Sequence, residues 1–189
     1  LLTVAQYSQP AAIILPFKGK DYDGLGLIRE LKKTPETGPV LVVAENSTQR
    51  DAAIDAGADM IEFDIRLTRD KQFVVIHDAT LERTTNGRGI VENHTLSELQ
   101  TLDAGSWFGR KFAGTVLPSL GEALALCRNR ILVNIEMKTE IQDDLCLDRL
   151  ADLVSTQIEA LRATRSVVIS SYTRRIIMSL RDRQEHLIT

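Results

Sequence analysis

Short apolar runs that read as β-strands alternate with helical patterns along this chain, and this alternation constrains the possible folds more than any other feature. Short continuous apolar runs are typical of parallel strands that are covered on both faces. Repeated βα alternation therefore predicts an α/β protein with a parallel sheet and helices outside it, as either a barrel or a doubly wound fold. The strand candidates are "AAIIL" (11–15), "VLVVA" (40–44), "DMIEFDI" (59–65), "FVVIH" (73–77), "ILVNIEM" (131–137) and "SVVISSY" (166–172).

Helix start and stop signals lie between these runs, as βα units require. Side chains that cap helix N-termini, and glycines that end helices, mark the boundaries. One long segment is the exception: residues 80–118 are rich in Gly, Thr and Asn and predict a long excursion with one short helix. Such excursions usually cover a site. The helix candidates are "GLGLIRELKK" after Asp23-Gly24, "STQRDAAIDAG" from Ser47 to Gly57, "TLSELQTL" with the capping box Thr95–Glu98, "SLGEALALC" with Ser119–Glu122, and an apolar face formed by Leu150, Leu153, Val154, Ile158 and Leu161.

Composition and charge exclude several classes of partner. The 189 residues suffice for one domain with a sizeable core. A net charge of -3, without a basic cluster, predicts no nucleic-acid partner, and no apolar run is long enough to predict a membrane span. Cys127 and Cys146 lack metal-ligand spacing and are interpreted as reduced thiols, which favours a cytoplasmic protein. The chain starts at Leu1 rather than methionine, so an upstream segment could be missing.

Acidic side chains occur on two of the strand candidates with a spacing of two residues. Glu62 and Asp64 share one face of their strand, and Glu136 and Lys138 share one face of another. The ordinary interpretation is a solvated strand face, but the neighbouring runs are apolar on both faces. Converging carboxylates would repel and raise each other's pKa values, and a hard divalent cation, Mg²⁺ or Ca²⁺, would compensate that charge.

His77 ends the strand candidate "FVVIH" and could supply a proton donor or acceptor near neutral pH. A histidine considered alone is more often structural. Together with three carboxylates and the ammonium of Lys138, which could pair with a phosphate, it favours metal-assisted phosphoester chemistry.

At these residues the chain resembles the glycerophosphodiester phosphodiesterase family, a group of metal-dependent hydrolases built on a TIM (βα)8 barrel. The resemblance runs from about Glu45 to Tyr172, with the motifs in the family's order and spacing. The motifs that carry it are "ENST", "AGADMIEFDIRLTRD", "VVIHDATLERTTNGRG", "TLSELQTLDAGSWFG", "LPSLGEAL" and "NIEMK".

The resemblance implies a site, an activity and a substrate class. Glu62, Asp64 and Glu136 would bind the metal, His77 would be one of two catalytic histidines, and Lys138 would contact the phosphate. The activity would be hydrolysis of small-molecule glycerophosphodiesters to an alcohol and glycerol phosphate, a reaction of lipid metabolism. No chemistry is assigned to Asp78, Arg83 or Asn86, and Arg83 could brace its loop. Trp107 and Phe108 could wall the cleft or pack the long loop, and His94 and His186 are interpreted as surface residues.

The sequence departs from the family in one catalytic segment. Family members end the first barrel strand with Ala-His-Arg-Gly, whereas here "VLVVA" runs directly into "ENST". Either that segment is missing from this sequence, or the chain is a catalytically impaired, phosphodiester-binding or regulatory module. From "VLVVA" onward we also count five strands, where a complete barrel needs eight.

The N-terminal part raises a second resemblance. Residues 11–58, with "YDGLGLIREL" and the run into "AGAD", resemble the middle of a response-regulator receiver domain. Pro16 occupies the position of the phosphorylated aspartate, so phosphorelay activity is not supported. We therefore predict an N-terminal βα segment, residues 1–38, followed by the barrel domain, residues 39–189. A receiver-like interaction domain is the third hypothesis, and it predicts no acidic triad.

Overall fold

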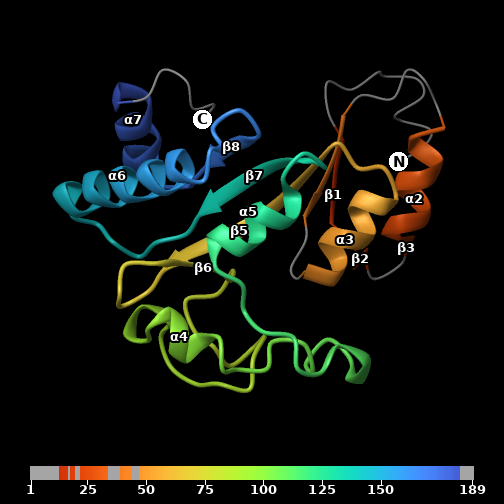
Figure 1. The fold of residues 1–189 in the computed structure, drawn as a ribbon, viewed down its shortest axis with the longest axis horizontal. Coiled ribbons are helices and arrows are strands. Elements are labelled where there is room, and N and C mark those ends of the chain that lie inside the picture. The colour runs from red at the N-terminus through yellow and green to blue at the C-terminus, as the bar shows by residue number, and fades with distance from the viewer. Residues whose placement is uncertain (1–12, 17, 20–21, 34–38, 44–46, 184–189) are drawn as a thin grey trace.

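One mixed sheet organises the chain (Figure 1). The computed structural model describes residues 13–16, 18–19, 22–33, 39–43 and 47–183. The main path of the sheet has the order β1-β4-β5-β7-β8, and every neighbouring pair on it is parallel. The strands of that path are β1 (Ile13–Pro16), β4 (Val40–Val43), β5 (Met60–Leu67), β7 (Leu132–Met137) and β8 (Val167–Ser170).

The run "FVVIH" differs from the other strands. It forms β6 (Phe73–Val75), which pairs antiparallel with β5, so the expectation of a parallel strand over 73–77 is wrong. The physical reason is the connection: residues 68–72 form a short turn, whereas a parallel crossover needs about a dozen residues or more. His77 consequently lies beyond the end of the strand, in irregular backbone. A separate two-stranded hairpin joins β2 (Lys18–Gly19) to β3 (Tyr22–Asp23).

The two helices with a predicted capping box begin where the sequence placed them. Asp23 accepts a hydrogen bond from the Leu25 backbone N–H at the start of its helix. Both capping boxes are present, with Thr95 and Ser119 as the N-cap residues. Gly57, at a φ of 91°, follows the second helix in the left-handed region that glycine tolerates. The α-helices are α2 (Gly24–Leu31), α3 (Ser47–Asp55), α4 (Leu96–Leu99), α5 (Leu120–Cys127), α6 (Asp144–Ala160) and α7 (Arg174–Arg183).

The two faces of the sheet differ, and this decides between the two predicted architectures. On β7, Val133, Ile135 and Met137 are buried in one apolar core together with residues of α2, α3, α5, α6 and α7. Leu132, on the opposite face, is 46% exposed. A doubly wound fold covers both faces of its sheet with helices, whereas a barrel places them outside only. The structure is therefore part of a barrel wall, and over the described residues the sheet does not close.

Truncating a side chain on the helix-covered face of β7 should cost more stability than truncating one on its opposite face. Ile135 has no exposed surface, so Ile135→Ala is expected to lower the free energy of unfolding by about 2–5 kcal/mol through lost burial and a residual cavity. Leu132→Ala, on the opposite face of the same strand, is the matched control and should cost much less. Urea denaturation followed by circular dichroism measures both, and equal losses would contradict the two-face description.

The long excursion between β6 and α5 has its own small core. It contains the 3-10 helices η1 (Val91–Asn93) and η2 (Arg110–Phe112) as well as α4, the single short α-helix that the sequence predicted. Figure 1 shows this segment to one side of the sheet, around α4. Its apolar residues pack against residues of β6 and the segment that follows it, which anchors the excursion beside the C-terminal end of β5. The cluster consists of Val74, Ile76, Leu81, Val91, Leu99, Ala104 and Leu117.

Several sequence predictions concern the chain outside this core. β1 pairs with β4 in the main sheet, and the division at residue 38 stays a prediction, since residues 34–38 lie outside the described part. The join between "VLVVA" and "ENST" and the predicted surface residue His186 also lie outside it. Cys127 and Cys146 form no disulfide in the described structure. Among the residues that the structure covers, no helix has both the length and the hydrophobicity for crossing a membrane.

Candidate active site

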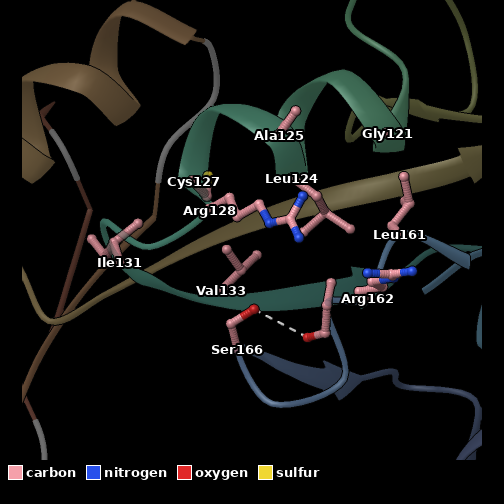
Figure 2. A pocket seen from close by; sticks show the side chains of 11 residues that line it. Gly121, Leu124, Ala125, Cys127, Arg128, Ile131, Val133, Leu161, Arg162 and Ser166 are labelled. Atoms are coloured by element: carbon pink, nitrogen blue, oxygen red, sulfur yellow. Dashed lines mark hydrogen bonds between the residues drawn. The ribbon is translucent and has the colours of Figure 1, made fainter. Parts of the chain in front are cut away.

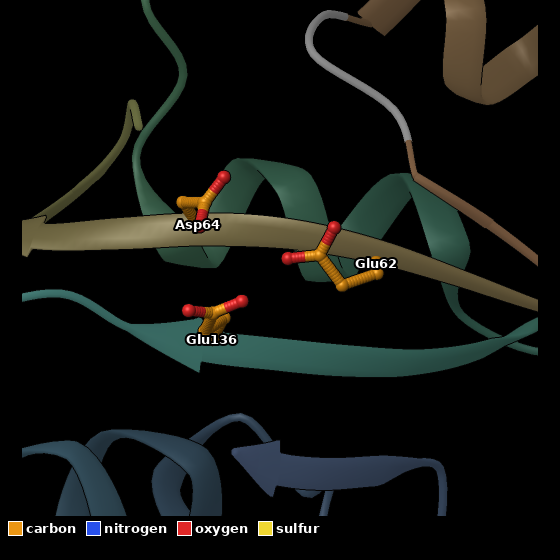
Figure 3. A group of neighbouring side chains, drawn as sticks. All are labelled: Glu62, Asp64 and Glu136. Atoms are coloured by element: carbon orange, nitrogen blue, oxygen red, sulfur yellow. The ribbon is translucent and has the colours of Figure 1, made fainter. Parts of the chain in front are cut away.

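Three carboxylates from two neighbouring strands meet on the face of the sheet opposite the helices (Figure 3). Glu62 and Asp64 come from β5, and Glu136 comes from β7. The parallel register places Asp64 beside Glu136, so both side chains leave the sheet in the same direction. One carboxylate oxygen from each residue lies within 4.8 Å of the others. The structure thus brings together the predicted acidic residues, which could hold a metal ion.

The electrostatics of this cluster suit a cation. Glu62 is only 6% exposed, and burial, with the nearby charges of Asp64 and Glu136, raises its pKa to about 8 although Lys138 opposes this. Burial also raises the pKa of Asp64, against the opposing effects of Lys138 and His77. The buried Oε1 atom of Glu62 has no hydrogen-bond partner within the described structure. A buried carboxylate oxygen without a donor is suited to a hard divalent cation, so these residues fit the group.

Lys138 follows β7 directly and lies between two of the carboxylates. Its Nζ atom is 3.3 Å from Asp64 Oδ1 and also forms an ion pair with Glu136. Burial lowers the pKa of Lys138, but the two carboxylates raise it by more than burial lowers it. The net shift of the pKa is therefore upward, and the ammonium stays charged. One ammonium compensates only part of the charge of three ionised carboxylates. The side chain also lies 5.0 Å from the ring centroid of Tyr172, which is 90% exposed.

His77 lies on the irregular segment after β6 with an exposed imidazole. Its Nδ1 atom is 2.7 Å from Asp78 Oδ1, and its backbone carbonyl accepts a hydrogen bond of 2.8 Å from Arg66 Nε. The imidazole is near enough to lower the pKa of Asp64. The predicted acid/base residue and the predicted metal ligands therefore belong to one region, near the C-terminal ends of the parallel strands, where barrel enzymes carry their active sites.

Sequence reasoning missed three polar residues at this site. Asn134 pairs in register with Glu62, and its Oδ1 atom is buried without a partner in the part of the chain described. Ser170 on β8 pairs in register with Glu136, and its Oγ atom is likewise buried without a hydrogen-bond partner among the described residues. Arg66, two residues beyond Asp64, is buried beneath His77. The two-residue period continues from Asp64 to Arg66 and from Glu136 back to Asn134, whereas Ser170 is placed beside Glu136 by the register of β8.

The remaining candidates have structural surroundings. Arg83 braces its loop by binding Asp78, as one interpretation expected. Trp107 and Phe108 pack edge to face inside the excursion, with ring centroids 5.6 Å apart. Asn86 Oδ1 accepts a hydrogen bond from the backbone of Asp103, which ties two parts of the excursion together.

A pocket lies on the other face of the sheet and is separate from the carboxylates (Figure 2). It is enclosed by Leu124 of α5, Val133 of β7 and Leu161 at the end of α6, with Arg128 and Arg162 also among its lining residues. Val133 points toward the helices, whereas Glu136 on the same strand points away from them. This pocket is therefore not part of the acidic site.

Comparisons with known proteins point to one family. The sequence pattern of the glycerophosphoryl diester phosphodiesterase family matches residues 35–189. A glycerophosphodiester phosphodiesterase of Caldanaerobacter subterraneus subsp. tengcongensis is 40% identical over 136 residues, which cover 71% of this chain and 55% of that protein. One of Bacillus altitudinis is 37% identical over 122 residues, covering 64% of this chain and 49% of that protein.

Solved structures show the same fold. A crystal structure of glycerophosphodiester phosphodiesterase from Agrobacterium tumefaciens superimposes with a TM-score of 0.65 at 30% identity, covering 92% of this chain and 63% of that one. A phosphodiesterase of Oleispira antarctica gives a TM-score of 0.64 at 24% identity, covering 79% and 63%. The chain spans about half the length of the two relatives named above.

Proposed function

The chain belongs to the glycerophosphoryl diester phosphodiesterase family, and on that premise we propose that it hydrolyses glycerophosphodiesters to an alcohol and glycerol phosphate. The observation that carries the proposal is the acidic cluster of Glu62, Asp64 and Glu136, with an ammonium inside it and an imidazole beside it. A phosphodiester is an anion that three carboxylates would repel. The cluster can therefore bind such a substrate only when a cation lies between the carboxylates and the phosphate.

Each side chain then has a defined task. The three carboxylates would hold Mg²⁺ or Ca²⁺, which when bound would neutralise charge developing on the phosphate. Lys138, whose charge those acids would no longer need once a cation was bound, would turn from its carboxylate partners toward a non-bridging phosphate oxygen. His77 would move a proton to or from a reacting oxygen. The attacking group is either water or a hydroxyl group of the substrate.

A second candidate function rests on the sequence between Ala44 and Glu45, where the His-Arg segment of the family is absent. With one acid/base group instead of two, the chain would bind phosphodiesters without efficient turnover. The loss of one such group costs about 10²–10⁴-fold in rate. The two candidates share the cation site and differ only in catalysis.

Hydrolysis of glycerophosphocholine by the purified chain, with Mg²⁺ or Ca²⁺ and then with EDTA, tests the proposal. Turnover that EDTA abolishes supports the enzyme. Cation binding without turnover supports the binding module. If the chain neither binds the cation nor hydrolyses the substrate, both candidates fail.

Cation binding should depend on pH through Glu62. A ligand carboxyl must be ionised, and the pKa of Glu62 is raised to about 8, so protons compete with the cation below that pH. We expect the apparent affinity for Mg²⁺ to rise by about tenfold per pH unit between pH 6 and 8 and then to level off. Isothermal titration calorimetry in two buffers of different ionisation enthalpy should count about one released proton at pH 7. Binding that releases no proton would contradict this assignment.

A further inference from the structure

The long excursion holds the imidazole of His77 through a chain of charged contacts. Asp78 Oδ1 lies 2.7 Å from His77 Nδ1, on the side chain of the very next residue. Arg83, five residues further on, binds the same carboxylate with both arms of its guanidinium: Nε donates to Oδ2 at 2.6 Å, and an Nη atom donates to Oδ1 at 2.9 Å. Both oxygens of Asp78 therefore accept hydrogen bonds from the guanidinium, and Oδ1 also lies within hydrogen-bond distance of the His77 ring.

This arrangement determines which ring nitrogen carries the proton. The bidentate guanidinium, together with the His77 contact, holds the pKa of Asp78 well below its ordinary value despite partial burial, so the carboxylate is ionised and can only accept hydrogen bonds. His77 Nδ1 must then carry a proton, and in the neutral ring Nε2 carries the lone pair. An imidazole without such a partner would populate both tautomers and rotate more freely.

Two further contacts fix the frame around this pair. The Arg83 guanidinium lies 5.8 Å from the ring centroid of Trp107, a residue of the excursion whose indole N–H donates to Ala104. On the other side, buried Arg66 holds the His77 carbonyl. The ring is thus positioned from the excursion through its side chain and from the sheet through its backbone.

We propose that Asp78 and Arg83 are positioning residues, which keep the proton of His77 on Nδ1 and present Nε2 to the reacting oxygen. The role in turnover rests on the proposed function, whereas the tautomer does not. The excursion then contributes to catalysis by orienting His77, which lies at its start. If Asp78 and Arg83 only braced the loop, the position of the proton on the His77 ring would not depend on either side chain.

The test is the ¹⁵N spectrum of the histidine ring nitrogens in the full chain, without metal or substrate, at a pH where the rings are neutral. The His77 signals are assigned by their loss in His77→Gln. The native protein should show His77 protonated at Nδ1, and Asp78→Asn should shift the ring toward the Nε2 tautomer. Arg83→Met should do so in part, because Asp78 would lose the bidentate contact that fixes its carboxylate beside Nδ1, and Arg83→Lys should restore the native signal. Arg88→Met, at an exposed arginine of the same excursion, is the matched control and should change nothing.

The outcomes separate the two roles. A native ring protonated at Nε2, or a tautomer unchanged in both Asp78→Asn and Arg83→Met, would overturn the proposal. If Asp78→Asn fails to fold by circular dichroism, the two Arg83 variants decide. In hydrolysis assays Asp78→Asn should lower kcat by about 10–100-fold with little change in KM. Absence of hydrolysis in the native chain would contradict the proposed function, while the spectra would still decide the positioning.

Discussion

Glu62→Gln is expected to lower kcat/KM for glycerophosphocholine by about 10³-fold at pH 8, because it removes one of three cation ligands. The loss of charge stabilisation by a bound cation is worth several kcal/mol, and each 1.4 kcal/mol corresponds to a factor of about ten. Glutamine keeps the shape of the side chain, so the neighbouring strands should remain in place. Steady-state hydrolysis with saturating Mg²⁺ or Ca²⁺ measures the effect.

Without metal, Glu62→Gln should be more stable than the native chain. A variant that loses activity but gains stability identifies Glu62 as a cation ligand more sharply than the loss of activity alone. At pH 8 and above, native Glu62 is a buried carboxylate that ionises against Asp64 and Glu136, with an oxygen lacking a donor in the described structure. The neutral amide removes this repulsion, so thermal unfolding in EDTA should occur at a higher temperature than in the native chain. Stabilisation by added Mg²⁺, which follows from binding to the folded state, should in turn be reduced.

The control for this prediction is Glu92→Gln, at a carboxylate in η1 of the excursion and outside the acidic cluster. It should alter neither hydrolysis nor the response to Mg²⁺. If Glu62→Gln retained full cation-dependent activity, Glu62 would not be a ligand. If it lost activity but was destabilised in EDTA, the argument about repulsion would be wrong even though the residue mattered.

The sequence was sufficient to predict the acidic cluster because strand geometry has few alternatives. A period of two places Glu62 and Asp64 on one face, and parallel register brings Glu136 beside Asp64. The barrel wall was also predictable as one of two options. The choice between them required the structure, because periodicity does not say which face of a sheet its helices will cover.

Other features depend on contacts between distant or irregular segments, which patterns do not encode. The short turn at residues 68–72 makes β6 antiparallel to β5, although the apolar composition of β6 matches that of the parallel strands. Asn134 and Ser170 carry no charge and lie within apolar runs, so only their register beside Glu62 and Glu136 gives them significance. The contact between Arg83 and Asp78 forms in irregular backbone, where spacing has no fixed geometry, so the sequence assigned no chemistry to either residue.

His77→Asn should lower kcat by about 10²–10⁴-fold, the range expected when one general acid/base group is lost. The expected distinction from Glu62→Gln lies in binding. His77 contacts Asp78 and does not belong to the group of side chains that could hold the cation. Its loss should therefore leave the affinity for Mg²⁺ and the associated proton release unchanged. His94→Gln is the matched control, since His94 follows η1 within the excursion.

The size of the His77 effect also bears on the His-Arg segment that the sequence lacks between Ala44 and Glu45. If His77 is the chain's single acid/base group, its removal should leave only the acceleration that charge compensation by the carboxylate site and Lys138 provides. A loss much smaller than tenfold would mean that proton transfer does not limit turnover, or that another group performs it. In that case His77 would be a structural residue held by Asp78, and the proposed mechanism would lose its proton donor while keeping its cation site.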